Sequence, residues 1–344
     1  MASDAFSVSA VIPAYNEAAR IASAIACVRA QSEPAAEIVV VDDGSSDATA
    51  DIAAAHGARV LRKSNGGLAS ARNLGLREAR GSWVAFLDAD DRWWPEKLAQ
   101  LRAAYEAAPH AGLIASDYRV VYDGSRALGS ALAGIPQFRP VARRRVAARV
   151  VTLERDSLLA ALVAGNFLLT SSIAVRRADV ERHALYYDES LPSLPEYHVS
   201  EDIEWFLRAA LHCDVLLIES ILADYNRHSD NMSASAGRLK YGDVKLGERV
   251  VAEPARYGRA TAERFRAVRR AHLAESAILY MRELEFGRAR AVGRQAFQES
   301  RSPADFGLFA LATFGDSVVG RYGARAARSL WRGTSVRLRS VRPS

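Results

Sequence analysis

Residues 83–91 read Trp-Val-Ala-Phe-Leu-Asp-Ala-Asp-Asp, and this stretch decides the fold that the sequence predicts. Its first five residues are mostly apolar, which is typical of a central strand buried on both faces of a sheet. Three carboxylates, Asp88, Asp90 and Asp91, then fall at the carboxyl end of that strand, where ligands bind in open α/β sheets. Carboxylates this close repel one another unless a cation neutralises them, and Mg²⁺ or Mn²⁺ prefers such oxygen ligands. The alternative is an acidic turn that caps the helix beginning near Pro95.

The strands expected earlier in the chain also end in acids or turn residues. Apolar runs at 6–13 and 37–42 are each followed by such a turn, and helices are expected between them. This short alternation of strands and helices predicts a parallel, doubly wound sheet. Because the carboxyl ends of parallel strands meet at one edge, we expect Asp43, Asp88 and Asp90 to converge there. Three converging acids favour a ligand site over separate helix caps.

Two further groups of polar residues are candidates for function. Ser200 precedes Glu201 and Asp202, and apolar residues follow at helical spacing, which predicts a helix with both acids in its first turn. The helix dipole stabilises a carboxylate there by ~0.3–1 kcal/mol, so Asp202 is either an ordinary capping acid or a general base facing a cleft. Arg227 and His228 are either a polar loop or contacts for a diphosphate beside the metal.

Charge divides the chain into an acidic front and a basic tail. Residues 234–344 hold 22 Lys or Arg and 10 Asp or Glu, so the remainder of the chain is net acidic. We predict a catalytic domain at 1–233 and a basic helical C-terminal extension at 234–344. The apolar run at 306–319, followed by arginines and Trp331, predicts either an anchor on an anionic membrane surface or a helix packed on the protein. Nucleic-acid binding is not expected, because no recognised binding motif is present.

Several features are predicted to be missing or irregular. No stretch approaches the ~20 apolar residues needed to span a bilayer, and no signal peptide is evident. The two cysteines lie far apart and are interpreted as free thiols of a reducing compartment. The sequence therefore predicts a cytoplasmic protein, peripheral on the inner face of the plasma membrane if its tail binds lipid. Residues 124–150 are expected to be irregular.

Six short motifs occur in an order that is characteristic of one enzyme family. They are Val-Ile-Pro-Ala-Tyr-Asn-Glu (11–17), Val-Val-Val-Asp-Asp-Gly-Ser-Ser-Asp (39–47), Gly-Leu-Ala-Ser-Ala-Arg-Asn (67–73), Asp-Ala-Asp-Asp (88–91), Glu-Asp (201–202) and Arg227 with Asn231. In this order they resemble the inverting family-2 glycosyltransferases with a GT-A fold, over about residues 6–233. The resemblance implies an α/β fold with a mixed, mainly parallel central sheet flanked by helices, followed by the helical C-terminal extension.

The resemblance also implies a role for each matching residue. The residues expected to bind the nucleotide of the donor are Pro13, Tyr15, Glu17, Asp43, Arg72, Asp88 and Arg227. Those expected at the Mg²⁺ or Mn²⁺ ion are Asp90, Asp88 and His228. Asp-Ala-Asp-Asp can be aligned with the acidic motif of the family in two ways, so Asp91 is an alternative ligand. Either Arg227 or His228 can face the diphosphate, and Asp202 is expected to be the catalytic base.

The function that the resemblance implies is a metal-dependent, inverting sugar transfer. The donor is a nucleotide-diphosphate sugar, most often UDP-linked, and the acceptor is a hydroxyl of a saccharide or lipid-linked molecule in the synthesis of cell-surface polysaccharide or glycolipid. Two other enzyme functions stay open: transfer of a hexose to a polyprenyl phosphate, and nucleotidyl transfer. The second usually needs a Gly-rich loop with Lys or Arg after the first strand, which residues 13–17 lack. A non-catalytic relic of the fold is disfavoured by the intact acids.

Overall fold

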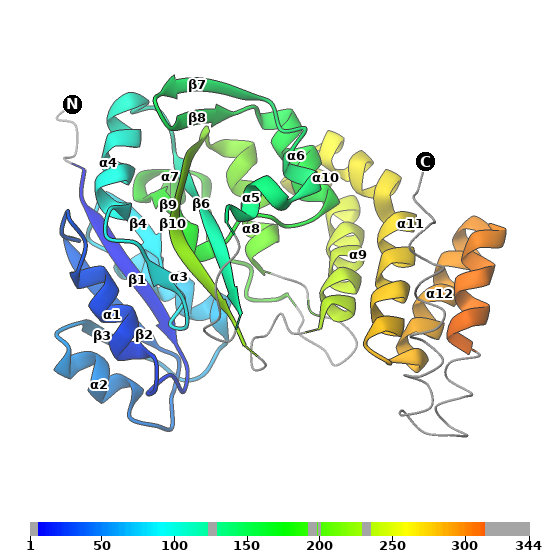
Figure 1. The fold of residues 1–344 in the computed structure, drawn as a ribbon, viewed down its shortest axis with the longest axis horizontal. Coiled ribbons are helices and arrows are strands. Elements are labelled where there is room, and N and C mark those ends of the chain that lie inside the picture. Colours follow the sequence, from blue (N-terminus) through cyan, green and yellow to red (C-terminus); the bar gives the residue numbers. More distant parts are fainter. Residues whose placement is uncertain (1–5, 123–128, 192–197, 199–200, 229–234, 314–344) are drawn as a thin grey trace. The chain divides into compact units, whose positions relative to one another are not determined.

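The computed structural model describes residues 6–122, 129–191, 198, 201–228 and 235–313 (Figure 1). The chain divides into two compact units. The first comprises Met1–Leu191, Glu201–Ser229 and Ala255–Thr261, and the second comprises Pro192–Ser200, Asp230–Pro254 and Ala262–Ser344. The predicted division at 233/234 into a catalytic domain and an extension stays a proposal.

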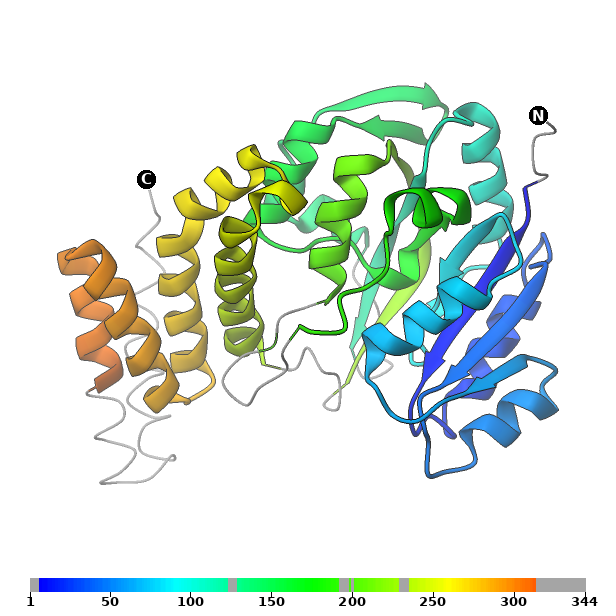
Figure 2. The same cartoon turned by 180° about the vertical axis from the view of Figure 1, so that it is seen from behind.

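The first part of the chain forms four parallel strands in the order β3-β2-β1-β4. They are β1 (Val8–Ala14), β2 (Glu37–Asp42), β3 (Arg59–Arg62) and β4 (Trp83–Phe86). The helices that connect them are α1 (Ile21–Arg29), α2 (Thr49–Ala55) and α3 (Leu68–Glu78). The two views together show α1 and α2 on one face of the sheet and α3 on the other (Figures 1 and 2). All residues of β1 and β4 are buried, as their continuous apolar runs predict.

The rest of the sheet mixes parallel and antiparallel strands. It continues from β4 in the order β9-β6-β10-β8-β7, and β5 pairs with β10. The strands are β5 (Arg92–Trp93), β6 (Leu113–Tyr122), β7 (Arg143–Ala147), β8 (Val150–Leu153), β9 (Ile173–Arg176) and β10 (Val215–Arg227). Strand β9 runs antiparallel to both of its neighbours, whereas β6 and β10 are parallel. The sheet is therefore mixed and mainly parallel, which confirms the predicted fold class.

Two details of the sequence interpretation were wrong. Residues 124–150, expected to be irregular, contain the short helix α5 (Ala131–Gly134), a 3₁₀ turn η1 (Pro136–Phe138) and strand β7. The arginines of β7 alternate too little with apolar residues to show a strand pattern, and β7 pairs only with β8 in the described part of the sheet. The apolar runs at 214–218 and 221–225 predict two separate strands, but they belong to one strand, β10, whose pairing register with β6 shifts between Ile218 and Ile221.

Four longer helices complete the first unit. They are α4 (Lys97–Ala107), α6 (Arg155–Ala164), α7 (Arg177–His183) and α8 (Glu201–His212). Helix α8 begins at Glu201, as predicted, and buries Ile203, Phe206 and Leu207. Its Trp205 stacks on Tyr187 with ring centroids 5.3 Å apart. The position of the acidic first turn of α8 is therefore fixed by the packing of the apolar residues of this helix.

The second unit is helical, as predicted for the C-terminal region. Its main helices are α9 (Ala236–Ala252), most of α11 (Arg259–Arg282), α12 (Phe286–Ser300) and a helix over residues 303–313. Along the chain, one boundary between the units falls after Pro254, the first residue of the short α10 (Pro254–Tyr257). Leu273, Tyr280 and Val292 contribute to one apolar cluster. A Cβ on Gly237 would lie 2.7 Å from the Tyr280 ring, so a glycine is needed for this close approach of α9 and α11.

The predicted membrane contact falls mostly beyond the described residues. The apolar run at 306–319 is described only to Thr313, and the arginine-rich segment after it lies outside the described residues. Within the described residues, no helix combines the length and apolar character required to cross a bilayer.

Candidate active site

Acidic residues follow the carboxyl ends of neighbouring parallel strands in the first unit. Strand β1 lies between β2 and β4, and the backbone N–H of Asp43 donates to the carbonyl of Ala14 at the end of β1. The backbone N–H of Leu87, just before Asp88, donates to the carbonyl of Val11. The pairing of these strands thus brings Asp43 and Asp88 to one edge of the sheet, as their positions in the sequence predicted.

Asp43 is buried and its carboxylate accepts several hydrogen bonds. Lys63 Nζ lies 2.6 Å from Oδ1, and the N–H groups of Gly66 and Gly67 donate at 3.0 and 2.8 Å. Gly67 has φ 85°, a conformation that favours glycine, and it precedes the first residue of α3. Asp43 therefore fixes the start of α3. A ligand that bound to the Asp43 carboxylate would have to share its two oxygens with Lys63, Gly66 and Gly67.

The residues expected to line the nucleotide pocket lie on β1 and the turn after it. Pro13 is a buried residue of β1, whereas Tyr15 is 51% exposed. The Glu17 carboxylate pairs with Arg20 at 2.9 Å, and its backbone N–H donates to Thr49 Oγ1 at 2.8 Å. Tyr15 is one of the few large hydrophobic side chains that are exposed among the described residues, so its ring is available for stacking on a ligand.

Arg72 joins the acidic motif to the acidic turn of α8. It is 2% exposed, and its guanidinium donates to Asp88 at 2.9 and 3.1 Å and to Glu201 at 2.8 Å. The guanidinium also lies over the Tyr187 ring, 5.3 Å from its centroid. Burial opposes the positive charge, but Asp88, Tyr187 and Glu201 outweigh it and raise the pKa of Arg72. One buried cation thus holds together two carboxylates that are 113 residues apart in sequence.

Two carboxylates of the acidic motif are partly open to solvent. The side chains of Asp88 and Asp90 are 27% and 20% exposed. Asp90 Oδ2 lies 3.1 Å from Nε2 of His228. Burial and the nearby charge of Asp88 raise the pKa of Asp90. A cation bound here would relieve this repulsion between like charges.

The acidic motif fits Mg²⁺ or Mn²⁺ through Asp88 and Asp90. Their oxygens are the ligand type that these ions prefer. Among the described residues, no cluster of three or more His, Cys, Asp or Glu side chains is arranged to hold a metal by itself. Mg²⁺ is commonly held by one or two carboxylates together with substrate phosphates, so a partial set suits a site that is completed by its substrate. Asp91, the alternative ligand, is 5% exposed.

Asp202 lies in the first turn of α8, next to the Arg72 partner Glu201. Its Oδ2 accepts a hydrogen bond from Asn166 Nδ2 at 2.9 Å, and its Oδ1 accepts from the N–H of Ile203 at 2.7 Å. Burial, and next the charge of Glu201, raise the pKa of Asp202 to about 7. A carboxylate with this pKa is well suited to accept a proton near neutral pH. The sequence interpretation did not single out Asn166, because no local motif marks it.

Arg227 is the last residue of β10 and His228 follows it, close to the acidic motif. The Arg227 guanidinium lies 5.9 Å from the centroid of the Tyr122 ring, whereas His228 contacts Asp90. The structure therefore brings His228 to the acids that were predicted to bind the metal. Asn231, the last residue of this motif, lies outside the described residues.

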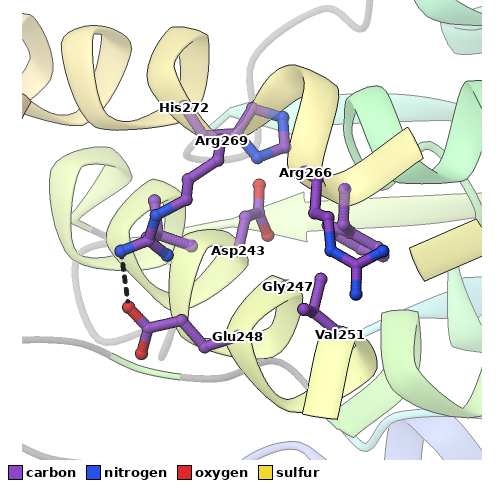
Figure 3. Close-up of a pocket in the computed structure, with 9 residues that line it drawn as sticks. Asp243, Gly247, Glu248, Val251, Arg266, Arg269 and His272 are labelled. Carbon is purple, nitrogen blue, oxygen red and sulfur yellow. Dashed lines mark ion pairs between the residues drawn. The ribbon is translucent and has the colours of Figure 1, made fainter. Parts of the chain in front are cut away.

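Among the cavities in the described residues, one lies beside the acidic motif and another lies in the second unit. One of about 510 Å³ lies between α1 and the acidic motif and includes Asp90, Asp91 and Asn226 in its lining. The other, of about 260 Å³, lies between α9 and α11 in the second unit, and Figure 3 shows Asp243 at its centre with Arg266, Arg269 and His272 around it. This second cavity contains none of the predicted site residues.

The comparisons with known proteins agree with this fold. The family model described as glycosyl transferase family 2 matches residues 9–144. The amylovoran biosynthesis glycosyltransferase AmsB of Erwinia amylovora is 30% identical over 236 residues, which cover 64% of this chain and 69% of AmsB. The chain therefore belongs to glycosyltransferase family 2. Three other curated relatives match over a smaller region, and the chain spans only 29–35% of their length.

Solved structures share the fold at low sequence identity. TarS 1–349 of S. aureus, solved in complex with UDP-GlcNAc, has a TM-score of 0.57 and is 20% identical, covering 89% of this chain and 79% of that chain. The mannosyltransferase PcManGT of Pyrobaculum calidifontis, solved with GDP-Man and Mn²⁺, has a TM-score of 0.53 and is 17% identical, covering 94% of this chain and 89% of that chain. These likenesses identify the fold as GT-A.

Proposed function

We propose that this chain is a metal-dependent, inverting glycosyltransferase that moves a sugar from a nucleotide-diphosphate sugar to an acceptor hydroxyl. The observation that carries the proposal is the buried Arg72, which contacts Asp88 and Glu201 at once. This contact supports a single site that includes the proposed metal acids and, beside Glu201, the proposed base Asp202. Membership of family 2 supports the reaction class.

The donor that the site suits is a nucleoside diphosphate sugar, with UDP as the first candidate and GDP as the second. TarS was solved with UDP-GlcNAc and PcManGT with GDP-Man, and both share the fold. Pro13, Tyr15, Glu17 and Asp43 are the proposed contacts of the nucleoside. Arg72, Asp88 and Arg227 are proposed to lie along the ribose and the diphosphate, where cationic guanidinium groups stabilise phosphate charge.

A divalent cation is proposed at Asp90 and Asp88, with His228 beside it. When bound, Mg²⁺ or Mn²⁺ offsets the negative charge that builds up on the leaving diphosphate. The repulsion between Asp88 and Asp90 supports this assignment, and so does the Mn²⁺ in the PcManGT structure. The protein itself contributes the orientation of both carboxylates through Arg72 and the contact between His228 and Asp90.

Asp202 is the proposed catalytic base. Its carboxylate takes the proton of the acceptor hydroxyl, and the hydroxyl oxygen then attacks the anomeric carbon on the face opposite the diphosphate. The bond to the diphosphate breaks as the new glycosidic bond forms, so the configuration inverts without a covalent intermediate. The pKa of about 7 keeps a substantial fraction of Asp202 ionised at neutral pH while leaving it basic enough to take the proton.

The proposed acceptor is a saccharide or a lipid-linked saccharide of cell-surface polysaccharide synthesis. The support is the relative AmsB, whose name assigns it to amylovoran biosynthesis. Transfer to a polyprenyl phosphate is the alternative within the same chemistry. The two differ in product, because an acceptor phosphate yields a sugar phosphodiester and an acceptor hydroxyl yields a glycoside.

Titration calorimetry with nucleoside diphosphates tests the site. We expect UDP or GDP to bind in a Mn²⁺-dependent manner, and Asp90→Asn to weaken that binding by about tenfold or more, since one anionic ligand is lost. Asp51→Asn, the same change at an exposed position of α2, is the matched control and should bind like wild type. Binding that is equal with and without Mn²⁺, or absent in the folded protein, would contradict the proposal.

A further inference from the structure

A buried 3₁₀ helix lies against the acidic motif and comes from a distant part of the chain. This helix, η2 (Thr170–Ser172), has all three residues buried. The hydroxyl oxygen of Ser171 accepts a hydrogen bond from the backbone N–H of Asp88 at 3.0 Å and donates its proton to Asp91 Oδ2 at 2.6 Å. One serine hydroxyl thus contacts both the first and the last residue of Asp-Ala-Asp-Asp.

The other oxygen of Asp91 connects the motif to the end of β10. Asp91 Oδ1 accepts from the backbone N–H of Asn226 at 3.0 Å. The Asn226 side-chain amide in turn donates to the backbone carbonyl of Asp90 at 2.7 Å. Both carboxylate oxygens of Asp91 are therefore turned towards protein donors, and the backbone on both sides of Ala89 is fixed by hydrogen bonds.

The 3₁₀ helix is itself held in place. The indole N–H of Trp93 donates to the carbonyl of Ser171 at 2.7 Å. The Nζ of Lys97, which is 0% exposed, donates to the carbonyl of Ser172 at 3.0 Å, and the Ser116 hydroxyl shares that carbonyl at 3.3 Å. A lysine this deeply buried needs its partners, so these contacts resist displacement.

We propose that Ser171, Asp91 and Asn226 form a positioning brace that sets the relative orientation of Asp88 and Asp90 for the divalent cation. In this brace Asp91 is a positioning residue. The proposed metal ligands are Asp88 and Asp90, whose side chains are more exposed than that of Asp91. The physical reason is that a carboxylate binds a metal ion tightly only when hydrogen bonds from neighbouring groups fix its orientation. The inference rests on the proposed metal-dependent function and names the residues that prepare its metal site.

The test compares two serines of the same 3₁₀ helix. Ser171→Ala removes the brace hydroxyl, whereas Ser172→Ala removes a hydroxyl that donates to the carbonyl of Leu169 and does not reach the acidic motif. Mn²⁺ affinity is measured by the electron paramagnetic resonance signal of free Mn²⁺, with UDP or GDP present. We expect Ser171→Ala to bind Mn²⁺ about 10–100-fold more weakly, and Ser172→Ala to bind it like wild type.

A second measurement distinguishes loss of carboxylate positioning from general damage to the folded protein. Nucleotide affinity without metal should be equal in wild type, Ser171→Ala and Ser172→Ala, because neither serine is assigned to the nucleotide. Wild-type Mn²⁺ affinity in Ser171→Ala, or equal losses in both variants, would overturn the brace. If Ser171→Ala does not fold, Asn226→Ala replaces it, because it removes the amide that donates to the Asp90 carbonyl, with the same expected loss and the same overturning result. If wild type itself binds no Mn²⁺ with any nucleoside diphosphate, the proposed metal site fails and the brace is overturned with it.

Discussion

Single residues decide how the separate motifs of this chain become one site. Arg72 is buried between Asp88 and Glu201, and removal of either carboxylate would leave the buried guanidinium with one charged partner fewer. A buried charge that loses its partner is costly, typically by about 3–5 kcal/mol. Arg72 therefore couples the proposed metal acids to the first turn of α8, where Asp202 lies.

The proposed base gives a specific pH dependence. Burial and the charge of Glu201 raise the pKa of Asp202 to about 7, and a general base works only when it is deprotonated. We expect kcat to rise with pH through about 7. Glu201→Gln removes the like charge beside Asp202, so the pKa of Asp202 should fall and the acid limb of the kcat profile should move to lower pH.

The control for this profile is Glu181→Gln, the same change at an exposed position of α7. Its acid limb should coincide with that of wild type. An acid limb that Glu201→Gln leaves in place would show that Asp202 is not the group titrating in the reaction.

At the scale of secondary structure, strand β9 explains the contacts that sequence reasoning could not find. The acids at 43, 88 and 90 were predictable, because each follows an apolar run that ends abruptly and parallel strands align such ends. Ser171 and Asn166 were not, because they reach the site only when β9 inserts antiparallel between β4 and β6. A four-residue strand carries too little periodicity to predict its neighbours.

Helix α4 contributes the buried Lys97, and its protonation links stability to pH. Burial lowers the pKa of Lys97 to about 7, from the ordinary value of 10.5. Between these two values the unfolded chain binds a proton that the folded chain does not, so this group makes the folded state more stable as pH rises. Below about pH 7 both states are protonated, and the full penalty of burying the charge remains.

This linkage is measured by urea unfolding of wild type and Lys97→Met at pH 7 and pH 9. The difference in unfolding free energy should shift by about 2 kcal/mol in favour of wild type at the higher pH. Other titrating groups cancel in the comparison, because both proteins share them. A difference that stays constant between the two pH values would mean that the Lys97 ammonium remains charged in the folded state.

At the scale of the whole molecule, the sequence predicted the GT-A class through the order of its motifs, and the family and the fold confirm it. The mixed character of the sheet also came from that resemblance, since strand and helix alternation alone predicted a parallel sheet. The membrane contact of the basic C-terminal extension stays a prediction, because its arginine-rich segment lies outside the described residues. The acceptor is predicted neither by the motifs nor by the fold, because one fold accommodates many different substrates.

The most direct test of the central claim is the rate of nucleoside diphosphate release from the donor sugar nucleotide, with a saccharide or water as acceptor. Wild type should release it only with Mg²⁺ or Mn²⁺ present. Asp202→Asn should lower the rate by about 10²–10⁴-fold, because the base is lost. Its donor affinity should remain close to that of wild type, because Asp202 is not assigned to the nucleotide. Near-wild-type turnover in Asp202→Asn, or release that does not depend on a divalent cation, would contradict the account.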